Sequence, residues 1–266
     1  MGRHGDNRAF LSNQSRRKFA CPSFGAPNAM TPAITLPSFA PVEYQTLRDN
    51  AYAQLREALM TGQFIPGQRV TIRGLAAALG MSPTPIREAV RRLAAERAIE
   101  AEPNRWMRIP ILTAAQLREL RAIRLALEGL AAEEAARRIT PAEIAEVQRH
   151  EAEIVALRPL GDPKQMIPRI SRLHFAIYRA SAMPDLVRII ESLWLRSAPY
   201  SNLLFPGYTR MEKGRLRAAV IAALKCRDAL EARNLIQADI AGALDYILTF
   251  ADRPTWPKIQ FDPAAE

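Results

Sequence analysis

The sequence has few of the features that mark membrane proteins, secreted proteins or enzymes with familiar catalytic motifs. No apolar run approaches the ~20 residues that a membrane span needs, and the polar N-terminus does not resemble a signal peptide. The two cysteines, Cys21 and Cys226, cannot form a disulfide framework, so a reducing cytoplasm is the expected location. Only three histidines occur, and no GxSxG motif or phosphate-binding loop is present, so we expect no enzymatic activity.

What the sequence does contain is a large apolar fraction and an excess of positive charge. Its 266 residues are 48% hydrophobic, which is enough for roughly two domains with their own cores. The formal net charge is +10. An excess of this size suggests an anionic partner, with nucleic acid as the first expectation and an anionic membrane surface as the second.

Residues 1–42 have a different composition from the rest of the chain. Prolines recur among small polar residues, and five Arg or Lys side chains stand against one aspartate. Nothing in this stretch repeats at helical spacing, so we expect a disordered basic tail. The tail either adds non-specific affinity for DNA or precedes a true start at Met30, and we favour no dedicated function.

The stretch that defines the first domain is Ser82-Pro83-Thr84-Pro85-Ile86-Arg87-Glu88-Ala89-Val90-Arg91-Arg92-Leu93. Ser82 suits an N-cap, Pro83 suits the first helical position, and the apolar residues then recur at helical spacing. Arg87 and Arg91 lie one turn apart on another face, where they can meet phosphates or base edges. A short helix over 72–79 and a break at Gly80 precede this helix, which gives the pattern of a helix-turn-helix.

Two neighbouring features support that interpretation. An amphipathic helix is predicted over 44–60, and two short runs, 98–102 and 106–109, flank a turn and predict a small β-hairpin, or wing. From the residues alone, an ordinary solvated helical hairpin remains the alternative.

The sequence TGQFIPGQRVTIRGLAAALGMSPTPIREAVRRLAAERAI resembles the N-terminal winged helix of the GntR regulators, over about 44–109. The following LRELRAIRLALEGLAAEEAA is similar to the opening of the C-terminal effector (FCD-type) domain of the FadR subgroup. The resemblance implies a mainly α fold: a winged helix-turn-helix over 43–112 and an all-α effector-binding and dimerisation domain over 113–255, followed by a tail over 256–266. It also implies a homodimer that binds a pseudo-palindromic operator in double-stranded DNA.

The resemblance assigns DNA contacts to five positions of this sequence: Arg73, Ser82, Thr84, Arg87 and Arg105. The chemistry is consistent, because arginine can read guanine with two hydrogen bonds while hydroxyl groups hold phosphates. Two residues depart from the family pattern. Pro83 stands where an arginine is usual, and Trp106 stands where the wing tip usually has glycine, which puts deep insertion of the wing in doubt.

The rest of the chain is helical by its pattern and predicts an all-α bundle. The expected helices are 114–138, 141–157, 164–181, 184–198, 211–226 and 228–250. Four polar residues lie on or beside the apolar faces of these helices: Arg124, His174, Arg217 and Asp239. Because buried charge is costly unless it is paired, these residues predict either internal salt bridges, such as Arg124–Glu128 and Arg217–Asp239, or a polar pocket.

The resemblance favours the pocket, because many relatives bind an effector at these positions. In relatives that bind a metal, an aspartate and three histidines hold the ion, and the matching residues here are Ile170, His174, Arg217 and Asp239. Of these four positions, only His174 has the residue that the metal-binding relatives have there. We therefore expect no metal cofactor. The effector is then expected to be a small carboxylate held by Arg217 and Arg124, with Tyr178 and Trp194 as further candidates for the pocket wall.

The expected function is therefore a sequence-specific, DNA-binding repressor or activator controlled by a small organic acid. The alternative is a regulator that binds DNA constitutively, which is expected if both arginines are paired internally.

Overall fold

The computed structural model describes residues 47–102, 106–205 and 213–253, all of which belong to one compact unit that spans Tyr44–Glu266. The basic tail predicted over 1–42, Arg105 and the tail predicted over 256–266 lie outside the described residues. No helix in the part described is long and apolar enough to cross a membrane.

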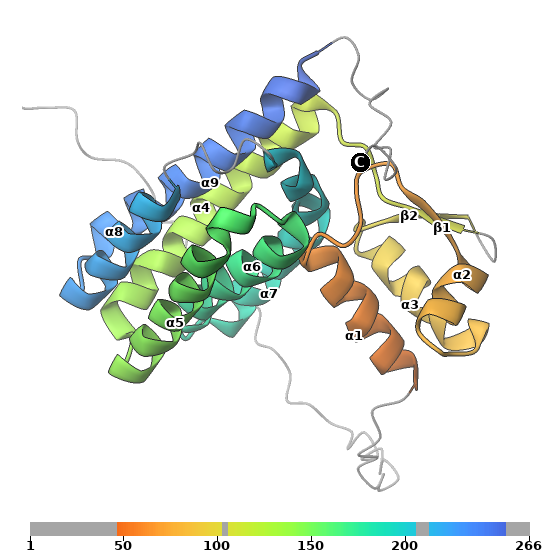
Figure 1. The fold of residues 1–266 in the computed structure, drawn as a ribbon, viewed down its shortest axis with the longest axis horizontal. Coiled ribbons are helices and arrows are strands. Elements are labelled where there is room, and N and C mark those ends of the chain that lie inside the picture. The colour runs from red at the N-terminus through yellow and green to blue at the C-terminus, as the bar shows by residue number, and fades with distance from the viewer. Residues whose placement is uncertain (1–46, 103–105, 206–212, 254–266) are drawn as a thin grey trace, which may run out of the picture. The chain divides into compact units, whose positions relative to one another are not determined.

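The N-terminal domain is a three-helix module with a small antiparallel sheet (Figure 1). Its elements are α1 (Leu47–Met60), β1 (Arg69–Thr71), α2 (Ile72–Ala78), α3 (Pro83–Ala95), β2 (Glu100–Glu102) and β3 (Trp106–Arg108). The strand order is β1-β3-β2, with Val70 opposite Met107 and Ala101 also opposite Met107. The apolar stripe of α3 lies in the core, because Ile86 and Leu93 are fully buried.

The turn between α2 and α3 forms largely as the sequence predicts. Gly80 has φ +62°, a left-handed conformation that favours glycine, and α3 starts at Pro83. Ser82 occupies the N-cap position with extended backbone, but its side chain makes no capping hydrogen bond. Its exposed hydroxyl is therefore available to another partner.

The C-terminal domain is all-helical, as expected for a bundle. Its elements are α4 (Ala114–Arg138), α5 (Pro141–Leu157), η1 (Arg158–Leu160), α6 (Pro163–Arg179), α7 (Pro184–Ser197), η2 (Ala198–Leu204), α8 (Lys213–Cys226) and α9 (Ala229–Ala251), where η denotes a 3-10 helix. Thr113 and Thr140 form capping boxes at the starts of α4 and α5, which explains why these helices begin where they do.

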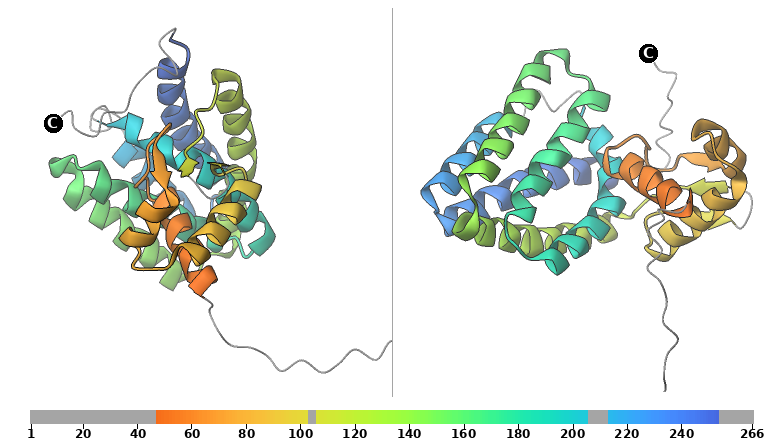
Figure 2. Two further views of the ribbon diagram at one scale, coloured as in Figure 1. Left: turned by 90° about the vertical axis from the view of Figure 1, so that its right-hand side faces the viewer. Right: turned by 90° about the horizontal axis from the view of Figure 1, so that it is seen from below.

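The long helices α4 and α9 lie side by side and run antiparallel (Figures 1 and 2). Arg118 near the start of α4 pairs with Asp252 at the end of α9, and Arg233 near the start of α9 pairs with Glu133 near the end of α4. Gly129 permits their close approach, because a Cβ atom there would lie 2.8 Å from Gln237 Nε2. α6 and α7 contact α4 as well, and these four helices supply most of the pocket described below.

Two elements differ from the pattern that the sequence predicts. β1 is a third strand that the sequence analysis does not predict, and it is held by pairing with β3. The helix expected over 184–198 ends at Ser197 and continues as seven residues of 3-10 helix. Pro199 explains this change, since it has no N–H for an α-helical hydrogen bond and its ring clashes with the carbonyl group four residues earlier.

Candidate DNA surface and effector pocket

The predicted DNA contacts lie on α2 and at the start of α3. Arg73, Ser82 and Thr84 are exposed, and Arg87 is partly buried. Among the described residues no hydrogen-bond partner reaches Arg87 Nε. Arg91 differs, because its Nη1 lies 3.0 Å from Glu88 Oε1 in an exposed ion pair. The surface thus combines cationic and hydroxyl side chains beside the N-terminus of α3, which suits contact with phosphates and base edges.

Trp106 is the first residue of strand β3. It pairs with Thr71 and Glu102 across the sheet and is partly buried. The guanidinium carbon of Arg69 lies 4.9 Å from the centroid of the indole ring, a cation–π geometry. The indole is therefore packed against β1.

The C-terminal domain contains a cavity of about 70 Å³. Its polar wall consists of Arg124, His174, Trp194, Ser197, Ser201 and Asp239, and its apolar wall consists of Ile167, Ile170, Ala198, Leu204, Phe205, Ile240, Ala243, Leu244 and Ile247. The cavity can therefore hold a small molecule with one polar end and an apolar body.

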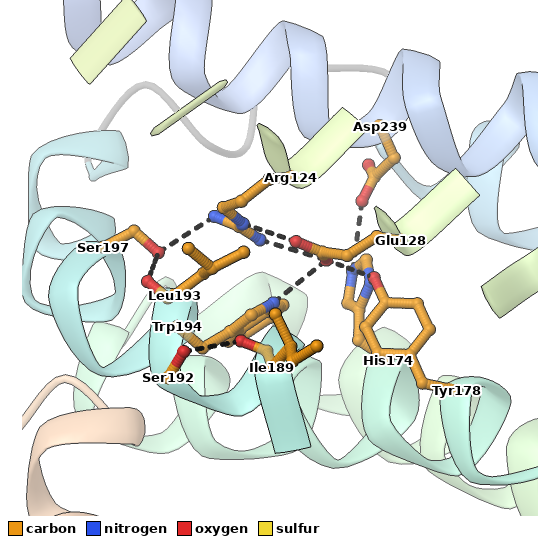
Figure 3. A network of polar contacts seen from close by, with 10 residues as sticks. All are labelled: Arg124, Glu128, His174, Tyr178, Ile189, Ser192, Leu193, Trp194, Ser197 and Asp239. Atoms are coloured by element: carbon orange, nitrogen blue, oxygen red, sulfur yellow. Dashed lines mark hydrogen bonds and ion pairs between the residues drawn. The ribbon is translucent and has the colours of Figure 1, made fainter. Parts of the chain in front are cut away.

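Glu128 does not line the cavity, but it connects residues of the polar wall to one another. This fully buried carboxylate accepts hydrogen bonds from Arg124, from Tyr178 Oη at 2.5 Å and from Trp194 Nε1 at 2.9 Å (Figure 3). Arg124 also donates to Ser197 Oγ at 3.1 Å, and its guanidinium carbon lies 4.7 Å from the centroid of the Trp194 ring.

Tyr178 and His174 extend this network to Asp239. His174 Nδ1 lies 2.9 Å from Tyr178 Oη, and His174 Nε2 lies 3.2 Å from Asp239 Oδ2. Because the Tyr178 hydroxyl donates to Glu128, it accepts from His174 Nδ1. One proton must then lie between His174 Nε2 and Asp239 Oδ2 for that contact to be a hydrogen bond. The five residues Arg124, Glu128, Tyr178, His174 and Asp239 form one connected network, hereafter called the buried relay.

Two pKa shifts fit the directions of these bonds. Burial lowers the pKa of Arg124, but the adjacent Glu128 carboxylate more than compensates, so the pKa lies above its ordinary value. Burial and the same carboxylate raise the pKa of Tyr178 well above its ordinary value. The guanidinium therefore stays charged and the phenol stays protonated, and both act as donors to Glu128.

Arg217 is buried beside Glu151 rather than in the cavity wall formed by the described residues. Its Nε pairs with Glu151 Oε2 at 2.5 Å. Burial raises the pKa of Glu151 even though Arg217 opposes that effect. Arg217 pairs with Glu151, and His174 pairs with Asp239.

The four predicted pocket residues are therefore brought together only in part. Arg124, His174 and Asp239 line one cavity, Tyr178 supports His174 from behind, and Arg217 lies with Glu151. The pairing of Arg124 with Glu128 that the sequence analysis offers is present. The further bonds of Glu128 to Tyr178 and Trp194 are not predicted, because only the contact one helical turn away can be read from the sequence.

No group of three or more histidine, cysteine, aspartate or glutamate side chains is placed to hold a metal ion in the ranges that the structure describes. Ile170, at one of the positions that holds the ion in metal-binding relatives, instead contributes apolar surface to the cavity.

Three helices with a winged hairpin, joined to an all-helical bundle, are the architecture of a DNA-binding transcription regulator. Comparisons with known proteins agree. Residues 47–109 match the model described as bacterial regulatory proteins, gntR family, and residues 119–242 match the FCD domain. The chain belongs to the GntR family and carries an FCD domain.

Individual relatives support the same assignment. The HTH-type transcriptional regulator McbR of Escherichia coli K12 is 33% identical over 200 residues, which cover 73% of this chain and 89% of McbR. A solved structure of E. coli McbR/YncC superposes with a TM-score of 0.72 at 31% identity and covers 77% of this chain and 98% of that one. A putative GntR regulator from Rhodococcus sp. RHA1 shares the fold, with a TM-score of 0.62 at 20% identity, covering 76% of this chain and 97% of that one.

Proposed function

We propose that this regulator changes its affinity for operator DNA when a small organic acid binds in the cavity among α4, α6, α7 and α9. The observation that carries the proposal is the composition of the cavity wall. A guanidinium, an imidazole, a carboxylate and two hydroxyl groups line a cavity whose wall is otherwise mostly apolar. Binding sites for small molecules commonly combine a largely apolar wall with a few placed polar groups.

Arg124 is the residue proposed to meet the acid. Of the two arginines considered, only Arg124 lines the cavity, and its neighbour Ser197 offers a second polar contact. Because Glu128 already shares the guanidinium, an incoming carboxylate competes with Glu128 for these donors. That competition gives the ligand a way to shift α4 relative to α7, the helix that carries Trp194 and Ser197.

A thermal-shift screen of small mono- and dicarboxylic acids tests this proposal. An acid present at one hundred times its Kd stabilises by about 2.7 kcal/mol, equivalent to a rise in Tm of about 5–10 °C for a chain of this size. Ala243→Leu fills the cavity without changing any charge and is expected to weaken binding by about tenfold or more. Ala145→Leu, on the exposed face of α5, is the matched control and should leave the shift unchanged.

A specific observation also favours a second candidate, a regulator that binds DNA constitutively. Arg124 is paired with Glu128 and Arg217 with Glu151, so neither buried arginine needs a ligand to balance its charge. The two candidates differ in the same screen. If no acid changes either the melting temperature or the affinity for operator DNA, the constitutive candidate is the correct one.

The DNA-bound form is proposed to be a homodimer on a pseudo-palindromic operator. One copy of the surface around Arg73 and Arg87 reads few base pairs, whereas two copies on one face of the duplex read two half-sites about one helical turn apart. Selection of bound DNA from a random pool should return an inverted repeat. A single non-repeated site would contradict the dimeric arrangement.

The protein is proposed to work without a bound metal. Arg124 lines the polar wall together with the His174–Asp239 pair. A guanidinium repels a cation and cannot ligate it. Elemental analysis of the purified protein is expected to find no stoichiometric zinc, nickel or manganese, and a chelator should leave Tm unchanged. About one tightly held metal per chain, lost in His174→Ala, would contradict this expectation.

A further inference from the structure

The 3-10 helix η2 carries cavity residues on one side and contacts to the DNA-binding domain on another. Ala198, Ser201 and Leu204 line the cavity. These residues recur every third position, and in a 3-10 helix residues three apart lie above one another. The cavity-facing side of η2 is therefore a continuous row along its whole length.

Residues between those positions bind the backbone of the N-terminal domain and of the segment that follows it. Tyr200 Oη donates to Pro110 O at 2.8 Å and accepts from Leu112 N at 2.6 Å. Asn202 Nδ2 donates to Gly62 O at 2.9 Å and to Phe64 O at 3.3 Å. Tyr200 is fully buried, so these bonds are shielded from water.

Two further contacts connect the cavity wall to the same domain. Gly62 follows α1 with φ +68°, and a Cβ atom there would lie 3.1 Å from the side chain of Ile167, a cavity residue on α6. Arg56 of α1 pairs at 2.6 Å with Glu191 of α7, which precedes η2 directly. Contacts from α6, α7 and η2 therefore all reach the segment from α1 to Phe64.

The geometry of η2 makes it sensitive to a change at the cavity. Runs of 3-10 helix longer than about four residues are uncommon, and η2 has seven. Rewinding to an α-helix changes the rotation from about 120° to about 100° per residue, so three residues turn by about 60°. A rotation of that size would carry Tyr200 and Asn202 away from their carbonyl partners while Ser201 and Leu204 move in the cavity wall.

We propose that η2 transmits the state of the cavity to the DNA-binding domain, with Tyr200 and Asn202 as its positioning residues. The proposal rests on the proposed effector function. An occupant that presses on Ser201 and Leu204 displaces η2, and the hydrogen bonds to Pro110, Leu112 and Gly62 move with it. Without those bonds the cavity can still be occupied, but the DNA-binding domain no longer responds.

The experiment uses Ala243→Leu as a surrogate for a bound ligand. This substitution fills the cavity from α9 and leaves the sequence of η2 unchanged. Affinity for an operator selected with the wild-type protein is measured by fluorescence anisotropy in the full-length chain. The filled cavity is expected to change that affinity by about fivefold or more, a usual size for allosteric coupling. In the Tyr200→Phe, Asn202→Ala double variant, Ala243→Leu should change the affinity for operator DNA by less than about twofold.

Tyr246→Phe is the control substitution. It removes a hydroxyl group from α9 and should leave the change in operator affinity caused by Ala243→Leu intact. If a variant fails to fold, Ala243→Val is used in place of Ala243→Leu, and Tyr200→Phe and Asn202→Ala are tested one at a time.

The outcomes separate the inference from the proposed function. An unchanged response in the Tyr200→Phe, Asn202→Ala background would overturn the role of η2 and leave the effector function intact. A filled cavity without effect on operator affinity in the wild-type background would also overturn it. The effector function itself is judged independently by the thermal-shift screen with acids.

Discussion

Glu128→Leu is expected to lower the free energy of unfolding by about 3–5 kcal/mol, the usual cost of removing one partner from a buried ion pair. The substitution leaves Arg124 charged and buried, with Ser197, outside the relay, as its remaining hydrogen-bond partner among the described residues. It also removes the acceptor for Tyr178 Oη and Trp194 Nε1. An orphaned buried donor costs more than the hydrogen bond contributes when it is made, so both losses add to the effect.

Urea denaturation followed by circular dichroism measures this change. Glu88→Leu is the matched control, because Glu88 also pairs with an arginine one turn later but in an exposed setting, where a pair contributes about 0–1 kcal/mol. Arg124→Met combined with Glu128→Leu should recover part of the loss by removing the unpaired charge. A loss for Glu128→Leu no larger than that of Glu88→Leu would show that the buried relay does not stabilise the fold.

The fold class could be predicted because its strongest determinants are local in sequence. Ser82 and Pro83 mark the start of α3, Thr113 and Thr140 begin helices as capping residues, and Pro141 and Pro184 follow helix breaks. The prediction of a winged helix-turn-helix followed by an all-α bundle is confirmed. β1 was missed because a three-residue strand exists only through its pairing with β3, far along the chain.

The candidate pocket was less predictable, because its pairings depend on packing between helices distant in sequence. The sequence could place Arg124, His174 and Asp239 on inward faces, and all three line the cavity. It could not choose which carboxylate meets each cation, since every inward face offers several. Arg217 shows the difficulty: a helical pattern places it in the interior, but only the packing of α8 against α5 selects Glu151 as its partner.

η2 illustrates a third case, in which a proline could be seen but its consequence could not. Pro199 comes directly after the helix expected over 184–198, but the chain continues there in 3-10 form and supplies both cavity wall and domain contacts. The roles of Tyr200 and Asn202 follow from carbonyl groups brought near them by the fold, and no local pattern indicates these partners.

Arg87→Ala is expected to weaken binding to the selected operator by about 1–3 kcal/mol, or roughly 5- to 150-fold, and to relax the preference at one base pair. Arg87 lies in the first half of α3, three residues after Thr84 and five after Ser82, both of which are exposed. The α3 N-terminus and the hydroxyl groups of these two residues suit phosphates, which fix the register of the helix in the major groove. Arg87 Nε is buried and has no hydrogen-bond partner among the described residues.

Arg91→Ala is the matched control for this prediction. It removes the same charge one turn further along α3, but Arg91 is exposed and already paired with Glu88, so a smaller loss spread evenly over all sequences is expected. Both variants are compared with the wild type at one fixed salt concentration, by anisotropy with the selected operator and with operators changed at single base pairs. If Arg87→Ala binds the operator as tightly as the wild type, or loses affinity equally for every sequence, Arg87 does not read a base and the proposed docking of α3 is wrong.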